Sequence, residues 1–236
     1  MLARILRNTA ANYLLKFVQM ALGIVAVPVL IANVGADGYG TLVLAGTLLG
    51  YFMFFDLGLS EAITKYVAQY NAMGERQALD RLISTSLAVF IVIGVVLCVI
   101  VTLLIKAGAL SIFSFPETLV AEAKEVFLLA AMLSLLAWPR MCLQGILRGL
   151  EEFVVLNAAI GVGRVMAIAL AIMLARGDAE LSTVFLAMQA DLFLALIVLP
   201  VLVRRRLPGW HPRFCDVHWG TLAMTWAFSG WLMLAK

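Results

Sequence analysis

Runs of about twenty residues that are almost free of charge recur along this sequence, and they constrain its fold more than any other feature. A helix that crosses a bilayer needs roughly 20 consecutive apolar residues. Windows of that length fall at residues 12–34, 39–59, 83–105, 126–147, 153–175 and 181–203, and a further run begins near residue 220. The sequence therefore predicts an all-α polytopic membrane protein, with a six-transmembrane-helix bundle and the start of a seventh helix.

The composition agrees with this prediction. Hydrophobic residues make up 64% of the 236 residues and charged residues 13%, whereas a soluble domain averages about half and about a quarter. We expect residues 1–203 to form one six-helix lobe, residues 204–219 a basic cytosolic linker, and residues 220–236 a truncated seventh helix. The loops between the runs are short, so we predict no soluble catalytic domain and no enzyme.

The positions of lysine and arginine predict the orientation of the bundle, because cytoplasmic loops of membrane proteins carry an excess of both. Twelve of these residues fall in the amino-terminal segment and in the loops on its side, and three fall on the other side. The amino terminus is therefore expected in the cytosol. The twelve are Arg4, Arg7, Lys16, Lys65, Arg76, Arg81, Arg140, Arg148, Arg204, Arg205, Arg206 and Arg213; the three are Lys106, Lys124 and Arg176.

Two charged residues, Arg164 and Asp191, fall in the middle of apolar runs. Each lies 10 or 11 residues from the start of its run, roughly 15–17 Å into the membrane. The turn between the two runs is centred near Asp178, so an antiparallel hairpin brings both side chains to the same depth. We predict an Arg164–Asp191 pair. It either holds two helices together or forms a substrate-facing cation with a supporting carboxylate, since charges in the membrane face a partner or water.

The first run carries a polar stripe on one helix face. Asn12, Lys16 and Gln19 recur at helical spacing, and the small or polar residues Gly23, Ala26 and Asn33 continue the stripe. Such a face is expected to look into the bundle or onto a wet cavity, so Asn12, Lys16 and Gln19 join Arg164 and Asp191 as candidates for a substrate cavity. In the second run Gly46 and Gly50 form a G-x-x-x-G pattern, which favours close helix contact.

A further acid, Asp56, interrupts the end of the second run. It lies 17 residues beyond Tyr39, roughly 25 Å into a core about 30 Å thick, so it is expected near the cytosolic boundary. Asp56 either ties the helix to its neighbours at this boundary or takes part in gating or ion coupling. The polar segment that follows is expected to extend this helix into the cytosol and to turn near Gly74.

The remaining polar residues point to no cofactor or nucleic acid. The three cysteines show no C-x-x-C spacing. His211, Cys215 and His218 share one polar stretch, but we predict no metal site there. The net charge of +3 comes from basic residues scattered between apolar runs, which is unlike the clustered basic surface of a nucleic-acid-binding protein.

Two stretches resemble a known family. Residues 34–68, VGADGYGTLVLAGTLLGYFMFFDLGLSEAITKYVA, contain a Gly-rich turn with Tyr-Gly before an apolar run that ends in Asp-Leu-Gly-Leu. Residues 143–165, LQGILRGLEEFVVLNAAIGVGRV, contain Arg-Gly-Leu-Glu before an aromatic residue and an asparagine. Both resemble bacterial polysaccharide and O-antigen flippases of the multidrug/oligosaccharidyl-lipid/polysaccharide exporter superfamily.

The resemblance implies a transporter of the bacterial inner membrane that moves an undecaprenyl-diphosphate-linked oligosaccharide between leaflets. Such proteins have two six-helix lobes around a cationic cavity with alternating access, so the chain is expected to match the amino-terminal lobe. Arg164 and Lys16 would face the diphosphate, and Asp191 would tune Arg164 or carry a coupling proton. Transport could be driven by coupling to protons or sodium ions. A polysaccharide polymerase and glycosyltransferases would be partners. The alternatives are a multidrug cation extruder of the same superfamily and an integral-membrane polysaccharide polymerase or acyltransferase.

Overall fold

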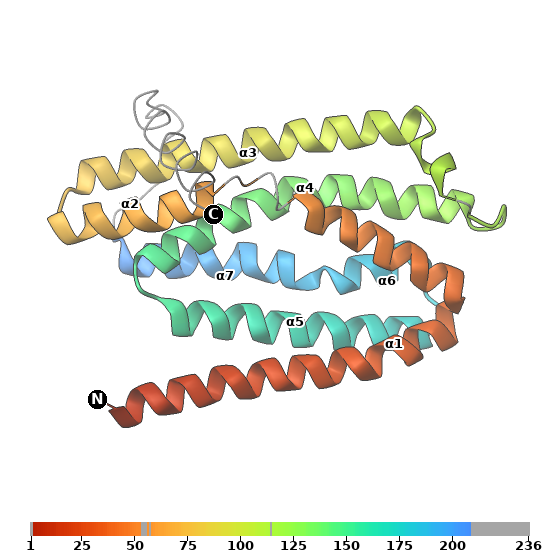
Figure 1. Ribbon diagram of the computed structural model, residues 1–236, viewed down its shortest axis with the longest axis horizontal. Coiled ribbons are helices and arrows are strands. Elements are labelled where there is room, and N and C mark those ends of the chain that lie inside the picture. The colour runs from red at the N-terminus through yellow and green to blue at the C-terminus, as the bar shows by residue number, and fades with distance from the viewer. Residues whose placement is uncertain (1, 53–55, 57, 114, 209–236) are drawn as a thin grey trace.

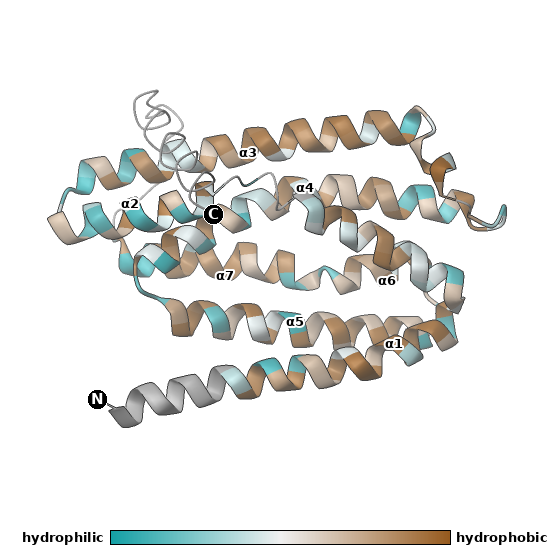
Figure 2. Ribbon diagram, in the orientation of Figure 1, coloured by the Kyte–Doolittle hydropathy of each residue, from teal (hydrophilic) through white to brown (hydrophobic). Residues whose placement is uncertain are grey.

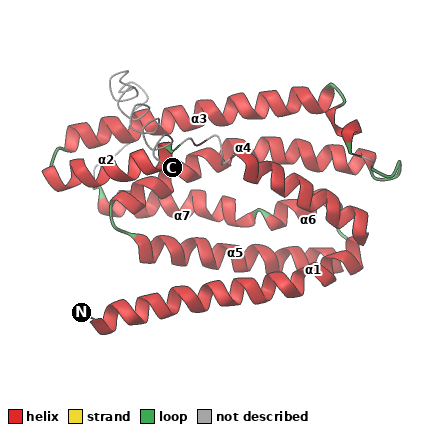
Figure 3. Ribbon diagram, viewed as in Figure 1, coloured by secondary structure: helices red, strands yellow, loops and turns green. Residues whose placement is uncertain are grey.

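The computed structural model describes residues 2–52, 56, 58–113 and 115–208, with side chains from Tyr13 onward apart from Phe52. All the regular structure in this part of the chain is helical (Figures 1 and 3). The α-helices are α1 (Leu2–Phe52), α2 (Leu59–Met73), α3 (Arg76–Lys106), α4 (Val120–Gly149), α5 (Phe153–Arg176), α6 (Leu181–Met188) and α7 (Ala190–Arg206), and the short 3-10 helix η2 (Ala109–Ile112) follows α3.

Within the described residues, five helices are long and apolar enough to cross a membrane. The first, Tyr13–Tyr51, is 39 residues long and covers nearly all of the first predicted run and the first 13 residues of the second. The last, Leu181–Arg206, combines α6 and α7, which meet at Gln189. With α1 counted as two crossings, the predicted six-helix membrane bundle is confirmed. Residues 209–236, which hold the predicted seventh helix and most of the predicted linker, lie outside the described residues.

The bend in α1 is at Gly35. Its backbone angles, φ 76° and ψ 166°, are the one non-helical pair inside α1, and this region of φ/ψ space is accessible essentially to glycine alone. A straight helix of 39 residues would be about 58 Å long, roughly twice the thickness of the hydrocarbon core. The bend lets the chain run along α5, turn, and return toward α4 (Figure 1).

The polar segment after the second crossing forms α2, and α2 ends at the predicted turn. Gly74 adopts the left-handed conformation, φ 71°, and its N–H donates to the carbonyl of Asn71 at 3.3 Å. A left-handed glycine that donates back to the last helical turn is a common way to end a helix. From there α3 runs back along α4, and Figure 2 shows that hydrophilic residues gather where α2 meets α3 while most of α3 is hydrophobic.

The helix α4 is the centre of the bundle and packs against α1, α2, α3 and α7. Trp138 is 1% exposed, and its ring lies 5.5 Å from that of Phe90 on α3. Glycines allow the close approach of the other helices. A Cβ atom on Gly149 would lie 2.7 Å from the Thr64 carbonyl oxygen of α2. Helix association in lipid depends on such van der Waals contact, because lipid tails are as apolar as the side chains.

The basic residues gather at one end of the bundle. The α2–α3 turn, the α4–α5 turn and the end of α7 lie at the end from which α1 starts, and Lys106 and Arg176 lie at the other end (Figure 1). At the first end, Arg206 forms a 2.6 Å ion pair with Glu152. We call this the basic end. One basic residue counted there, Arg140, belongs elsewhere, since it lies inside α4.

Candidate functional site

Arg140 makes the shortest ion pair in the middle of the bundle. Its Nη1 atom donates to Oδ2 of Asp191 at 2.9 Å, and the two side chains are 20% and 6% exposed. The assignment of Arg140 to a basic loop was therefore wrong. Because α4 continues without interruption to Gly149, Arg140 lies more than two turns inside the helix and faces α7.

Arg164 lies on the other side of the same carboxylate. Its Nη1 atom is 3.6 Å from Oδ1 of Asp191 and donates a 3.2 Å hydrogen bond to the carbonyl of Met188. The predicted Arg164–Asp191 pair is thus confirmed. Met188 is the last residue of α6, so this carbonyl lies at the break between α6 and α7. Arg164 is 45% exposed, more than twice as much as Arg140.

Local structure explains how the acid reaches this position. Asp191 lies in the first turn of α7, where the helix dipole favours a negative charge. Gly163 on α5 makes room for it, because a Cβ atom there would already lie 3.4 Å from the Asp191 Cβ atom. The break at Gln189 and the small residue on α5 therefore place one carboxylate between two guanidinium groups.

The three charged side chains line a cavity of about 550 Å³ between α1, α4, α5 and the α6–α7 joint. Its other polar side chains are Gln19, Thr47, Gln144 and Gln189. With two arginines and one acid, its lining carries a net charge of +1. Gly46 and Gly50 also line it, and within the described residues no atom outside the adjoining backbone of α1 lies within 4 Å of a Cβ built on either. No described helix therefore makes the close contact predicted for this G-x-x-x-G, and the two glycines widen the cavity instead.

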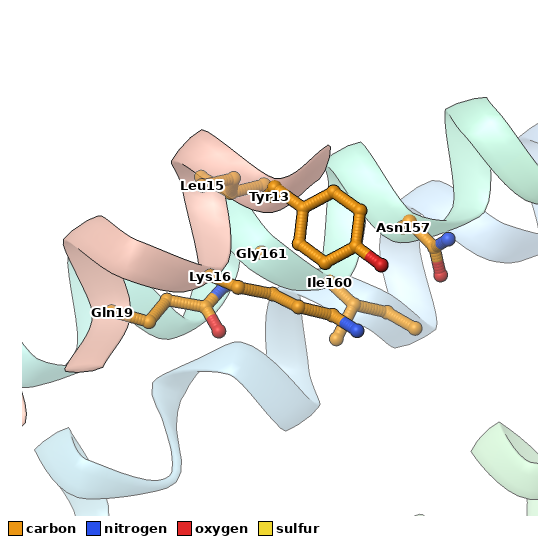
Figure 4. Close-up of a pocket in the computed structure, with 7 residues that line it drawn as sticks. All are labelled: Tyr13, Leu15, Lys16, Gln19, Asn157, Ile160 and Gly161. Carbon is orange, nitrogen blue, oxygen red and sulfur yellow. The ribbon is translucent and has the colours of Figure 1, made fainter. Parts of the chain in front are cut away.

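A second hollow of about 310 Å³ lies between α1 and α5 and shares Gln19 and Ile160 with the cavity. Figure 4 shows Lys16 and Tyr13 of α1 extending toward Asn157 of α5. Gly161 brings the two helices together, since a Cβ atom there would lie 2.9 Å from Nε2 of Gln19. Asn157 precedes Arg164 by seven residues of α5, so the Asn157 end of this hollow lies about 10 Å nearer the basic end than Arg164.

The polar stripe predicted on the first crossing faces this site only in part. Lys16 and Gln19 line the hollow, and Ala26 is buried. Asn33 is exposed and donates to the carbonyl of Val29 at 2.7 Å, so it satisfies its own helix. The side chain of Asn12 lies outside the described residues.

Asp56 lines neither hollow and instead receives hydrogen bonds from the start of α2. The backbone N–H of Ser60 donates to its two carboxylate oxygens at 3.1 and 3.3 Å, and the Ser60 hydroxyl donates at 3.1 Å. The N–H groups of a first helical turn lack partners within the helix. The carboxylate therefore caps the first turn of α2 at Ser60, the residue on which Gly145 of α4 packs.

The capping role predicts a modest loss of stability. Asp56→Ala is expected to lower the free energy of unfolding by about 1 kcal/mol, the usual value of an N-terminal cap, as measured by thermal unfolding in detergent. Asp56→Asn, which keeps an acceptor, should recover most of it. A folded Asp56→Asn variant with greatly reduced transport would contradict a purely structural role and favour gating or ion coupling.

The sequence interpretation missed Arg140, Gln144 and Gln189 as cavity residues. Arg140 carried a usable signal, because it falls inside the predicted apolar run 126–147, where a charge faces a partner or water. Within the described residues no group of three or more His, Cys, Asp or Glu side chains could hold a metal ion. The stretch with His211, Cys215 and His218 lies outside them.

Comparisons with known proteins agree with this architecture. The model of the family described as polysaccharide biosynthesis protein matches residues 5–235, nearly the whole chain. No curated protein and no solved structure matches it significantly. The match covers every helix that lines the cavity with Arg140, Arg164 and Asp191. The chain is a multi-pass membrane protein and belongs to the polysaccharide biosynthesis protein family.

Proposed function

We propose that the protein is a flippase that translocates an undecaprenyl-diphosphate-linked oligosaccharide across the bacterial inner membrane, for O-antigen, exopolysaccharide or capsule synthesis. The observation that supports this most is the cavity with Arg140, Arg164 and Asp191, whose lining has an excess of positive charge within the membrane. Guanidinium groups bind phosphate through paired, charge-assisted hydrogen bonds. The sugar chain would meet the amide and hydroxyl side chains of the same cavity.

The second hollow supports a path for the diphosphate. Lys16 places a cation between the basic end and Arg164, and Gln19 lines both spaces. An excess of Lys and Arg is typical of cytosolic loops, which supports a cytosolic position for the basic end and the amino terminus. The headgroup would then enter from the cytosolic leaflet at Lys16 and pass to Arg164 as the transporter alternates its access.

The charge of the cavity also favours this function over the rival ones. A multidrug extruder of the same superfamily carries cationic amphiphiles, which a cavity with a net charge of +1 would repel. A polysaccharide polymerase or acyltransferase needs a titratable group poised near the reacting atoms, whereas Asp191, the one acid among the described residues that line this cavity, is engaged by two arginines. We propose a transporter, coupled to a proton or sodium gradient, that acts beside separate polymerases and glycosyltransferases.

A flipping assay tests the proposal. The full-length protein would be reconstituted into proteoliposomes with a fluorescent undecaprenyl-diphosphate oligosaccharide, and movement between leaflets would be followed by quenching from outside. We expect translocation above that of protein-free liposomes, and none of a neutral undecaprenyl glycoside. Export of a cationic dye without movement of the lipid-linked sugar would assign the protein to the multidrug class.

A further inference from the structure

The two arginines of the cavity differ in how firmly Asp191 holds them. We infer that Arg140 is a positioning residue, which neutralises Asp191 and so leaves Arg164 free to bind the diphosphate of the substrate. This inference rests on the proposed function and adds a division of roles between two residues of like charge. It makes Arg164 the substrate-binding group, and it makes the contribution of Arg140 indirect.

The geometry of the carboxylate is asymmetric. Arg140 contacts Oδ2 at 2.9 Å, a good charge-assisted hydrogen bond, and its side chain is 20% exposed. Arg164 approaches Oδ1 only to 3.6 Å, beyond hydrogen-bonding distance, and is 45% exposed. No hydrogen bond reaches Oδ1 within the described residues. Asp191 is therefore bound firmly to one arginine and loosely to the other.

Besides Asp191, Arg164 contacts a backbone carbonyl, and a phosphate could take the place of this contact. To the described residues Arg164 donates one hydrogen bond, of 3.2 Å to the carbonyl of Met188, whereas a guanidinium has five N–H groups in a planar fork. The other N–H groups remain available to the 550 Å³ cavity that Arg164 lines. A phosphate can thus bind Arg164 while the carboxylate, 6% exposed, keeps the partner that compensates its charge.

Removing Arg140 should have a consequence that a purely structural role would not produce. Asp191 would then have one cation left within reach, Arg164, and would draw it into a close pair. The net charge of the lining would fall from +1 to 0, and binding of an anion would require breaking that pair. Neutralising Asp191 as well should release Arg164 and restore the charge to +1. The second substitution should therefore rescue the first.

The experiment measures binding of farnesyl diphosphate, a soluble prenyl diphosphate, to the full-length protein in detergent. We expect Arg140→Gln and Arg164→Gln each to weaken binding about tenfold or more. Arg140→Gln/Asp191→Asn should return to within about threefold of the wild type. Arg164→Gln/Asp191→Asn should stay weak, because it frees Arg140 and not the exposed arginine. Asp191→Asn alone should bind more tightly than the wild type.

Arg176→Gln is the matched control, because it removes an exposed arginine from the far end of α5 and should leave binding unchanged. Equal rescue by Asp191→Asn in both arginine backgrounds, or no rescue in either, would overturn the division of roles. Wild-type protein that fails to bind farnesyl diphosphate would overturn the proposed substrate class together with this inference. Should Arg140→Gln fail to fold, weaker binding by Asp191→Asn than by the wild type would still contradict the inference.

Discussion

Reversing the charge at Arg164 by Arg164→Glu is expected to reduce translocation of the lipid-linked diphosphate about a hundredfold or more. A unit charge roughly 5 Å from a phosphate contributes about 3 kcal/mol at an effective dielectric constant of roughly 20, and 1.4 kcal/mol corresponds to about a factor of ten. The substitution changes the net charge of the cavity from +1 to −1, so an anion would be repelled where it is now attracted. The proteoliposome flipping assay measures the loss directly.

A matched variant distinguishes the effect of a charge change inside the cavity from the effect of the same change in the net charge of the protein. Arg176→Glu makes the same change on the same helix, at an exposed residue that lines neither hollow, and should leave translocation near the wild-type rate. Both proteins should elute as single peaks in size-exclusion chromatography. If Arg164→Glu flipped the substrate as well as Arg176→Glu, the cavity would not be the route of the diphosphate.

Trp138→Ala is expected to cause the largest loss of stability. Removing a fully buried aromatic side chain costs about 3–5 kcal/mol, since the cavity left behind is only partly filled by relaxation. Trp138 is 1% exposed, lies against Phe90, and its Cδ1 atom would be 3.4 Å from a Cβ atom on Gly94. The whole interface between α3 and α4 would loosen. We expect the apparent melting temperature in detergent to fall by roughly 10 °C.

Phe17→Ala serves as the comparison for this experiment. Phe17 is another large aromatic residue in a membrane-crossing helix, but it is 69% exposed, so its removal should lower the melting temperature far less. Trp138→Phe should recover part of the loss by filling most of the space. A Trp138→Ala protein as stable as Phe17→Ala would show that α3 and α4 are held together elsewhere.

The fold could be predicted because lipid imposes simple rules on a sequence. Apolar runs of bilayer length locate the crossings, and the antiparallel hairpin brought Arg164 and Asp191 together from arithmetic on residue numbers alone. Gly74 ends α2 where a glycine after a polar segment predicted a turn. Each of these features depends either on residues that are neighbours in the sequence or on the nearly constant number of residues that a helix needs to cross the bilayer.

The interior of the site was harder to predict, because it depends on which helix faces which. Arg140 was assigned to a loop, although the charge can stay inside α4 only because Asp191 of α7 meets it. Gly46 and Gly50 were read as a packing motif, yet their helix faces the cavity at that point. The rotation of each helix about its axis and the helices it packs against are set by the whole bundle. A single sequence carries little information about these two features.

The torsion angles of Gly35 have a consequence for the sidedness of the protein. Because α1 turns back there, the chain crosses an even number of times before α3, and α3 begins on the face from which the chain started. A side chain that straightened the bend would leave a single passage and make that number odd. Every later helix would then have to enter from the opposite face, which the arginines at the end of α7 would oppose, because such residues favour the cytosolic side. The turn at Gly35 thus gives the crossings the parity that the positions of Lys and Arg also require.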